Sequence, residues 1–125
     1  MKLIEKVLMR RTLMSHRNDK LPIAVGYKIM KLLKQTEEDD KFYQTKLTEI
    51  ADTYGEKDPD GKLLRSKEGN IIIQNGKKDE CNALIKELEE TDVEEAEIKF
   101  TLDELAPINF SVDELFNLEH CIICE

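Results

Sequence analysis

The sequence predicts an α+β fold in which a long amphipathic helix and shorter helices accompany a small antiparallel sheet. Apolar residues recur at helical spacing from about residue 22 to residue 54, with no further proline inside the run. Two short strand-like runs flank a glycine turn and predict a hairpin at about 62–74. Residues 95–100 alternate apolar and charged side chains and predict a third strand, since a lone two-stranded ribbon is marginal in water.

A chain of 125 residues has the size of one domain with a modest core. We therefore expect residues 1–125 to form a single domain with three parts. Residues 1–54 form a helical, hairpin-like part. Residues 55–100 hold the β-hairpin, a helix and a strand, and residues 101–125 end in a C-terminal helix.

The first helix is predicted from residue 2 to about residue 16, because Asn18 and Asp19 then favour a turn. Pro22 suits the first turn of the helix that follows. The apolar stripe of the first helix consists of Leu3, Ile4, Val7, Leu8, Arg11 and Met14.

The long helix is predicted from Pro22 to Tyr54, and Gly55 is expected to end it in a left-handed conformation. At 1.5 Å per residue it would be about 50 Å long, which exceeds the diameter of so small a domain. Part of it should therefore protrude or pair with another copy in a homo-oligomer. The polar run at residues 35–41 weakens the stripe and leaves a bend open. The stripe consists of Val25, Ile29, Leu32, Leu33, Thr36, Tyr43, Leu47, Ile50 and Tyr54.

The segment YGEKDPDGKLLRSKEGNIIIQNG, residues 54–76, can be read as a calcium loop or as a turn. Its acids fall at the first, third and fifth positions of a calcium loop and Gly61 at the sixth. The twelfth position, which needs a bidentate Glu, is Lys67. Because Asp-Pro-Asp-Gly at 58–61 is a strong turn sequence by itself, we predict a turn and no metal or other cofactor.

Asp79 is predicted to cap a helix that ends at Glu90, with Ala83, Leu84 and Leu88 facing inward. Two capping boxes follow in the C-terminal part of the chain.

Thr101 and Glu104 are expected to open a single helical turn, and Ser111 and Glu114 to open the last helix. One side of that last helix is almost entirely apolar, so it should dock on the core or on a partner. Its apolar residues are Val112, Leu115, Phe116, Leu118, Ile122 and Ile123.

Cys121, Cys124, His120 and the distant Cys81 could together supply four zinc ligands. Structural zinc sites usually contain two Cys-x-x-Cys pairs, whereas this sequence contains one, and cysteine is among the most often buried residues. We predict buried thiols, with a zinc site or a redox pair as the alternatives. The odd number of cysteines and the lack of a secretion signal or of roughly 20 consecutive apolar residues favour a reducing, intracellular setting.

No catalytic residue is predicted, and the protein is not expected to be an enzyme. Neither His16 nor His120 lies in a nucleophile motif, and the sequence has no glycine-rich phosphate loop. Lys28, Lys31 and Lys34 recur at helical spacing and could contact nucleic acid, but a net charge of −8 opposes this. A solvated or internally paired basic face is the preferred interpretation.

Charge is unevenly distributed along the chain. Residues 1–34 carry nine Lys or Arg against two Asp or Glu, a net charge of +7, whereas residues 79–125 carry two against fifteen, a net charge of −13. The basic third could pair with the acidic third inside the molecule, or the acidic third could face a basic partner. The predicted partner-binding residues are Glu87, Glu89, Glu90, Asp92, Glu94, Glu95, Glu97, Asp103 and Glu104.

The motifs KLPIAVGYK, YGEKDPDG and NALIKELEETDVE follow one another and lead into an acidic C-terminal half. This order resembles a family of small proteins of tailed phages and prophages, which have an LPI…YK helix, a YGEKDxDG turn and an acidic C-terminal half. The resemblance covers nearly the whole chain, although Gly26 and the HCIICE end depart from the pattern. It implies a phage origin and an α+β fold.

A small acidic phage protein without a reactive centre is expected to act by protein–protein binding. The first hypothesis is an accessory protein of the anti-CRISPR type, which inhibits a host anti-phage defence complex in the host cytoplasm by presenting acidic residues to a basic nucleic-acid channel. The alternative is a virion structural component, a head or tail assembly protein that packs through its long helix. No membrane partner is expected.

Overall fold

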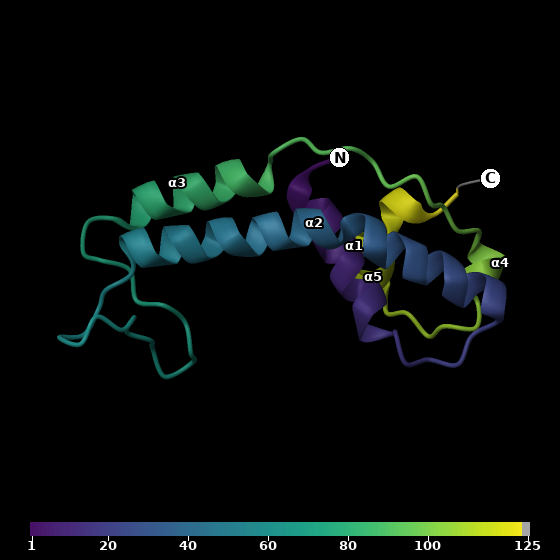
Figure 1. Cartoon of the computed structure of the whole chain (residues 1–125), viewed down its shortest axis with the longest axis horizontal. Helices are drawn as coiled ribbons and strands as arrows, with labels where there is room; N and C mark the ends of the chain where they lie inside the picture. The colour runs from purple at the N-terminus through teal and green to yellow at the C-terminus, as the bar shows by residue number, and fades with distance from the viewer. Residues whose placement is uncertain (124–125) are drawn as a thin grey trace.

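A single long helix, α2 (Ile23–Tyr54), is the axis of the computed structural model, which describes residues 1–123 (Figure 1). Its 32 residues correspond to a length of about 48 Å. The predicted helix is confirmed, and it runs without interruption through the acidic residues in its middle. Val25, Ile29, Leu32, Thr36 and Tyr43 of the predicted stripe are buried.

Helix α1 (Leu3–Ser15) crosses α2 at its acidic middle, where ion pairs join the two helices (Figure 1). Lys6 Nζ lies 2.6 Å from Asp39 Oδ2, and Arg10 Nε lies 3.2 Å from Asp40 Oδ2. The Lys6 side chain is only 8% exposed. A charge so far removed from water needs a close counter-ion, so the acidic run of α2 is the partner that α1 requires.

The larger of two hydrophobic clusters joins α1, the first half of α2 and the C-terminal third of the chain. Phe100 and Leu118 are completely buried in it, and α5 (Val112–Asn117) packs against α1. The cluster consists of Met9, Leu13, Val25, Ile29, Leu32, Ala96, Phe100, Leu105, Ile108, Leu118 and Cys121.

The smaller cluster lies where α3 (Lys78–Glu89) packs along the second half of α2 (Figure 1). Leu88 is buried there as predicted, but Ala83 and Leu84 are exposed, and Cys81 is buried in their place. Asp79 lies in the first turn of α3 and is not its cap. The cluster is formed by Leu3, Val7, Tyr43 and Leu88, with Ile4, Leu47, Ile50 and Val93 packed against it.

The predicted stripe of α1 is partly wrong. Leu8 and Arg11 are exposed, whereas Met9, Thr12 and Leu13 are buried. The reason is that α1 contacts α2, α3 and α5 and is therefore covered on more than one side. A helix enclosed in this way does not keep a single apolar stripe.

The predicted antiparallel sheet is wrong, because no β-strand forms within residues 1–123. The segment at 62–74 makes isolated bridges in place of a hairpin ladder. Leu64 N donates to Glu56 O (2.8 Å), Ile72 N donates to Leu64 O (3.1 Å), and Glu56 N donates to Ile72 O (2.7 Å). These three bonds close a triangle. Each pairing has one further backbone bond, from Asp58 N, Ser66 N or Gln74 N, and so amounts to a single bridge.

The strand predicted at 95–100 is also absent. Ala96 and Phe100 are buried while Glu95 and Glu97 are exposed, but Ile98 and Lys99 are both half-buried, so the predicted alternation holds for burial only in part. However, Phe100 makes only one parallel bridge, to Ile122. A segment needs a neighbouring strand to become part of a sheet, and none lies beside it within the described chain.

Gly55 ends α2 as predicted, but in an extended conformation with φ −73°, not a left-handed one. A Cβ atom at this position would lie 2.6 Å from Ala51 O and 2.6 Å from Leu63 Cδ2. Close approach of the backbone, and not a positive φ, therefore requires glycine here.

The two capping boxes are confirmed. Thr101 opens α4 (Leu102–Leu105) and accepts from Glu104 N at 3.2 Å, and Ser111 opens α5 and accepts from Glu114 N at 3.1 Å. The 3₁₀ turn η1 (Glu119–Cys121) follows directly after α5.

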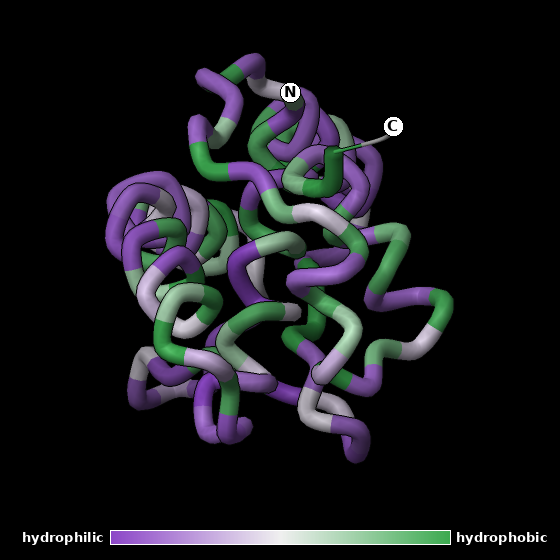
Figure 2. Tube along the Cα trace, turned by 90° about the vertical axis from the view of Figure 1, so that its right-hand side faces the viewer, coloured by the Kyte–Doolittle hydropathy of each residue, from purple (hydrophilic) through white to green (hydrophobic). Residues whose placement is uncertain are grey.

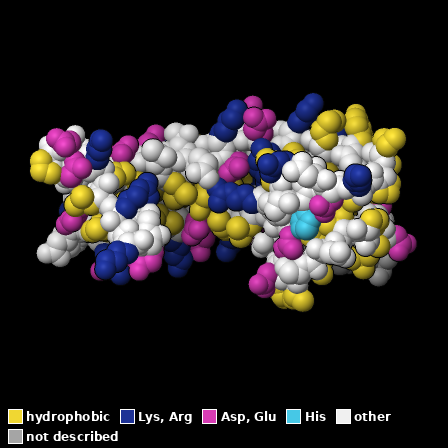
Figure 3. All heavy atoms as spheres, turned by 90° about the horizontal axis from the view of Figure 1, so that it is seen from below, with side chains coloured by type: hydrophobic (Ala, Val, Ile, Leu, Met, Phe, Trp, Pro, Cys, Tyr) yellow, Lys and Arg dark blue, Asp and Glu magenta, His cyan; other side chains and the backbone are white. Residues whose placement is uncertain are grey.

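Hydrophobic and hydrophilic residues are interspersed along the chain (Figure 2). Within residues 1–123, no helix combines the length and apolar character needed to cross a membrane. Hydrophobic side chains nevertheless gather on the surface at the end that holds α4 and the start of α2 (Figure 3). The most exposed of the large hydrophobic residues are Ile23, Leu102, Val112 and Phe116.

We expect Asp39→Asn to lower the free energy of unfolding by about 2 to 3 kcal/mol, because Lys6 then keeps a buried charge without a counter-ion. The loss should lie below that of a fully buried pair, since the Asp39 side chain is 32% exposed. Urea denaturation measures it. The control is Glu38→Gln at the neighbouring exposed position, which should change the free energy by less than about 0.5 kcal/mol. Equal losses of unfolding free energy in both variants would contradict the assignment of Asp39 as the counter-ion of Lys6.

Candidate functional site

The segment between α3 and α4 is extended and is fixed to the body of the protein through its backbone. Leu3 N donates to Thr91 O at 2.8 Å, and Val93 N donates to Met1 O at 2.9 Å. The Lys6 ammonium donates to Glu94 O at 3.0 Å. Because backbone groups make these inward contacts, most of the charged side chains of the segment point to solvent.

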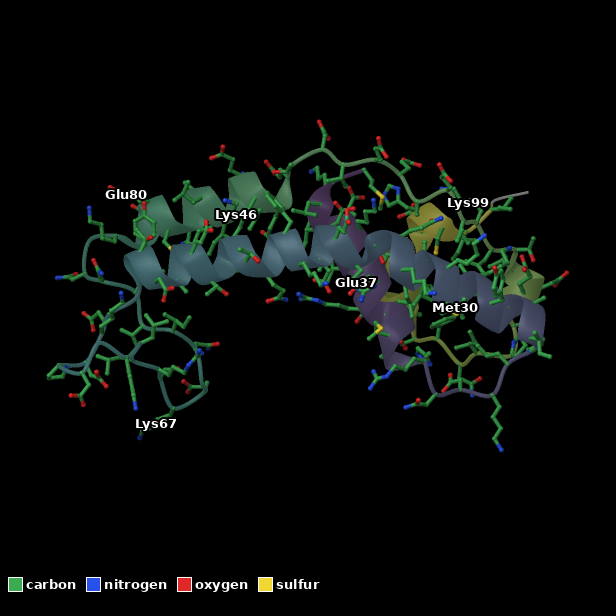
Figure 4. All side chains as sticks on the ribbon, viewed as in Figure 1. Met30, Glu37, Lys46, Lys67, Glu80 and Lys99 are labelled. Atoms are coloured by element: carbon green, nitrogen blue, oxygen red, sulfur yellow. The ribbon has the colours of Figure 1, made fainter. Side chains whose placement is uncertain are left out.

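These side chains form a continuous edge of carboxylates, which we call the acidic ridge. Oxygen-tipped side chains follow the connection from the end of α3 toward Lys99 (Figure 4). Glu95 lies 3.6 Å from Lys99 Nζ and 3.9 Å from His120 Nδ1, and the other ridge carboxylates make no ion pair within residues 1–123. The ridge consists of the exposed residues Glu87, Glu90, Asp92, Glu94, Glu95 and Glu97.

The other three predicted acids do not belong to the ridge. Glu89 is partly buried and accepts a hydrogen bond from Tyr43 Oη at 3.3 Å. Glu104 lies 2.9 Å from Lys28 Nζ in the capping box of α4, while Asp103 is exposed on that short helix. The backbone N–H of Thr101, followed by Lys28, lowers the pKa of Glu104.

Some basic groups of the chain are paired inside the molecule, but not in the way that the charge distribution alone suggests. Lys6, Arg10 and Arg11 pair with Asp39 and Asp40 in the middle third of the sequence.

Only Lys28, paired with Glu104, joins the basic first third to the acidic last third through a Lys or Arg ion pair within residues 1–123. Lys28 also lies 4.9 Å from the centre of the Phe100 ring, and Lys31 lies 5.5 Å from that of Tyr27. The ridge carboxylates therefore keep most of their charge uncompensated.

His16 forms a second cluster, between α1 and α5, which sequence reasoning missed. Its Nδ1 lies 2.9 Å from Asp19 Oδ2 and its Nε2 lies 2.6 Å from Glu114 Oε2. Burial lowers the pKa of His16, but the hydrogen bonds to the two carboxylates outweigh it and raise the pKa above the usual value. Both ring nitrogens are occupied, so this histidine holds two elements together and is not placed to take a proton from a substrate.

A signal for part of this cluster was present in the sequence. The capping box predicted that the Glu114 carboxylate reaches back to Ser111, and the structure places one oxygen 3.0 Å from Ser111 N while the other meets His16. The hydrogen bond from Ser111 N, followed by the one from His16, lowers the pKa of Glu114. The pairing with His16 joins residues 98 positions apart, which no local pattern reveals.

A hollow of about 460 Å³ lies beside this cluster between α1 and α2. In its wall, Arg10 pairs with Asp40 and His16 with its two carboxylates, whereas Arg17 and Lys34 make no ion pair within residues 1–123. Met30 and Gly26 belong to the wall contributed by α2. The hollow thus has the volume of a small-molecule pocket, and two of its lining cations have no counter-ion within the described residues.

The metal candidates are not brought together. Cys81 lies on α3, whereas Cys121 is completely buried in the larger cluster, and His120 pairs with Glu5. Cys124 lies outside the described residues. No group of three or more His, Cys, Asp or Glu within residues 1–123 is arranged to hold a metal ion.

The burial predicted for the thiols is confirmed for Cys81 and Cys121. The calcium-like loop turns the chain, as predicted: Asp58 Oδ1 accepts from Asp60 N and Lys62 N, both at 2.9 Å, and Gly61 has φ +84°. Two backbone N–H groups of the loop thus donate to the Asp58 oxygen that a bound cation would need as a ligand.

Comparison of the chain with protein-family models, with curated proteins and with solved structures yielded no match. The chemistry of the surfaces is therefore the basis for the functional proposals below.

We expect the stability advantage of the wild type over His16→Gln to be largest at low pH. Because the pKa of His16 is raised by folding, protonation stabilises the folded state fully below about pH 6.5, the pKa of histidine in the unfolded chain. This stabilisation is lost as the pH rises through the higher pKa of the folded protein. Urea denaturation between about pH 5 and pH 8.5 measures the difference. In the control background, which carries Asp19→Asn and Glu114→Gln, only the effect of burial on the pKa of His16 remains, so the advantage over His16→Gln should no longer be largest at low pH. In the wild-type background, an advantage that grows with pH would contradict the assignment.

We expect Cys121 to be alkylated by iodoacetamide far more slowly in the folded protein than in urea. Burial raises the pKa of its thiol to about 11, so the reactive thiolate is scarce at pH 8. The rate should fall roughly a hundredfold or more. Peptide mass spectrometry in a Cys124→Ser background assigns the labelled residue. Equal rates in native buffer and in urea would show that Cys121 is accessible.

Proposed function

We propose that this protein acts by non-covalent binding, and that its acidic ridge docks on the basic, nucleic-acid-binding surface of a protein complex. The observation that carries this proposal is the row of unpaired carboxylates. Five of the six ridge carboxylates have no ion-pair partner within residues 1–123, and Lys99 forms an ion pair only with Glu95.

The backbone tether of the ridge supports the same proposal. Its hydrogen bonds to residues 1–6 fix the segment before any partner arrives, so little ordering entropy is lost on binding. A fixed row of carboxylates is complementary to a channel that binds a phosphate backbone, and such complementarity raises the association rate and suppresses wrong partners. The net charge of −8 opposes direct binding to nucleic acid.

The resemblance to phage proteins suggests which complex this is. We propose a host anti-phage defence complex in the host cytoplasm, inhibited in the manner of anti-CRISPR proteins. Occupying the nucleic-acid channel requires no reactive centre in the inhibitor. Exposed charges are screened over about 8 to 10 Å at physiological ionic strength, so the binding should weaken as salt is added.

We expect the variant Glu90→Lys, Asp92→Lys, Glu97→Lys to bind its captured defence complex at least tenfold more weakly, because like charges then face one another. A tagged wild-type copy is first used to isolate the complex from infected cells. Surface plasmon resonance at increasing salt, with guide RNA or duplex as competitor, then compares the variants.

The matched control is Glu38→Lys, Asp52→Lys, Glu68→Lys, which changes the net charge equally at exposed positions outside the ridge. It should bind like the wild type. Equal weakening in both variants, binding that salt does not affect, or no competition by nucleic acid would each contradict the ridge as the docking surface.

The alternative function is that of a virion structural component, and the arm made of α2 and α3 favours it. Phe42 and Leu84 remain 48% and 38% exposed on this arm and line a hollow of about 260 Å³ with Ile50 and Leu88. Copies could pack through this apolar surface into a closed oligomer. Mass spectrometry of purified particles distinguishes the two functions, because an inhibitor is absent from particles and an assembly protein is present in stoichiometric amount.

A further inference from the structure

The apolar residues of helix α5 are all exposed, whereas the segment directly after the helix contains buried ones. Leu118, directly after the helix, and Cys121 are completely buried in the larger cluster. The outer side carries Val112 and Phe116, each 69% exposed, and Leu115, 40% exposed. Helical spacing places residues 112, 115, 116 and 119 on one face.

The outer side is shaped as a shallow groove of about 260 Å³. Val112, Leu115, Phe116 and Ile122 line it, and Glu119 is the single charged residue in its wall. The helix that carries the groove is firmly held. Asn117 Nδ2 donates to Thr12 Oγ1 at 3.2 Å, and Glu114 meets His16 at 2.6 Å, so the apolar residues are presented by a fixed element.

The acidic and basic residues of the segment that carries the groove are all of one sign. Residues 100–123 contain five Asp or Glu and no Lys or Arg. Glu104 and Glu114 are paired with Lys28 and His16, whereas Asp113 and Glu119 are exposed and make no ion pair within residues 1–123. The groove thus combines an apolar floor with an acidic border.

We propose that this groove is a docking site for a basic amphipathic helix of a partner protein, whose apolar face enters the groove while Lys or Arg residues meet Asp113 and Glu119. Helices commonly bind in this way, with apolar anchors at helical spacing. The proposal does not depend on the acidic ridge, and it gives the protein a second contact surface.

The acidic residues Asp113 and Glu119 beside the groove argue against two other binding partners, a second copy of the chain and a membrane. A second copy related by twofold symmetry would bring Asp113 and Glu119 against the same acidic groups. A membrane with anionic lipids would repel the border for the same reason. Of the three, only a basic amphipathic helix is complementary both to the apolar floor of the groove and to the acidic residues beside it.

The test uses a fluorescent peptide of Leu and Lys, with its leucines on one helical face, and a scrambled peptide of identical composition. Anisotropy titrations should give at least tenfold weaker binding for the scrambled peptide and for the Phe116→Asp variant. The matched control is Ile23→Asp at the start of α2, a 91% exposed apolar residue, which adds the same charge and should bind the peptide like the wild type. Equal affinity for both peptides, or equal losses in both variants, would overturn the proposal.

Two further measurements keep the proposal falsifiable if Phe116→Asp does not fold. Amide NMR shifts of the wild type with the peptide should change at residues 112–122 and not along the ridge, and the reverse would overturn it. Sedimentation of the protein alone should show no dimer, and sedimentation with phosphatidylcholine vesicles should show no lipid binding. A dimer that Phe116→Asp removes would assign the groove to a second copy. Lipid binding that Phe116→Asp removes would assign it to lipid.

Discussion

The ion pair between Lys6 and Asp39 sets the position of α1, and α1 in turn positions both of the surfaces on which function is proposed. The ammonium of Lys6 is nearly excluded from water and bonds to Asp39 at 2.6 Å and to Glu94 O at 3.0 Å. One side chain thus ties α1 to α2 and to the ridge segment. Removing either charge would leave the other without compensation, so this crossing is held in one arrangement.

Both surfaces follow from the way α1 is enclosed. On one side, Leu3 N binds Thr91 O and holds the ridge. Further along α1, Thr12 and His16 bind Asn117 and Glu114 and hold α5. The two surfaces are acidic because most of their carboxylates make no ion pair within residues 1–123. They differ in chemistry, since the ridge is a row of carboxylates and the groove of α5 is apolar with an acidic border.

Local patterns predicted local structure well. The long helix and both capping boxes depend on residues within a few positions of one another, and all were confirmed. The predicted sheet failed because alternation at 95–100 and turns around 62–74 indicate extended backbone, not a neighbouring strand. Of the nine acids predicted to bind a partner, six form the ridge. The other three do not belong to the ridge. Glu89 contacts Tyr43, Glu104 pairs with Lys28, and Asp103 lies on α4.

The sequence by itself determined three features: the charge of each segment, the helix ends that carry capping boxes, and the turns of the loop after α2. Each of these depends on composition or on contacts between residues a few positions apart. Tertiary structure alone decided which charges are neutralised and which apolar faces are covered. Lys6 with Asp39 and His16 with Glu114 join residues from different helices. Whether the last helix buries Leu118 or Phe116 depends on where α1 lies, and residues distant in the chain fix that position.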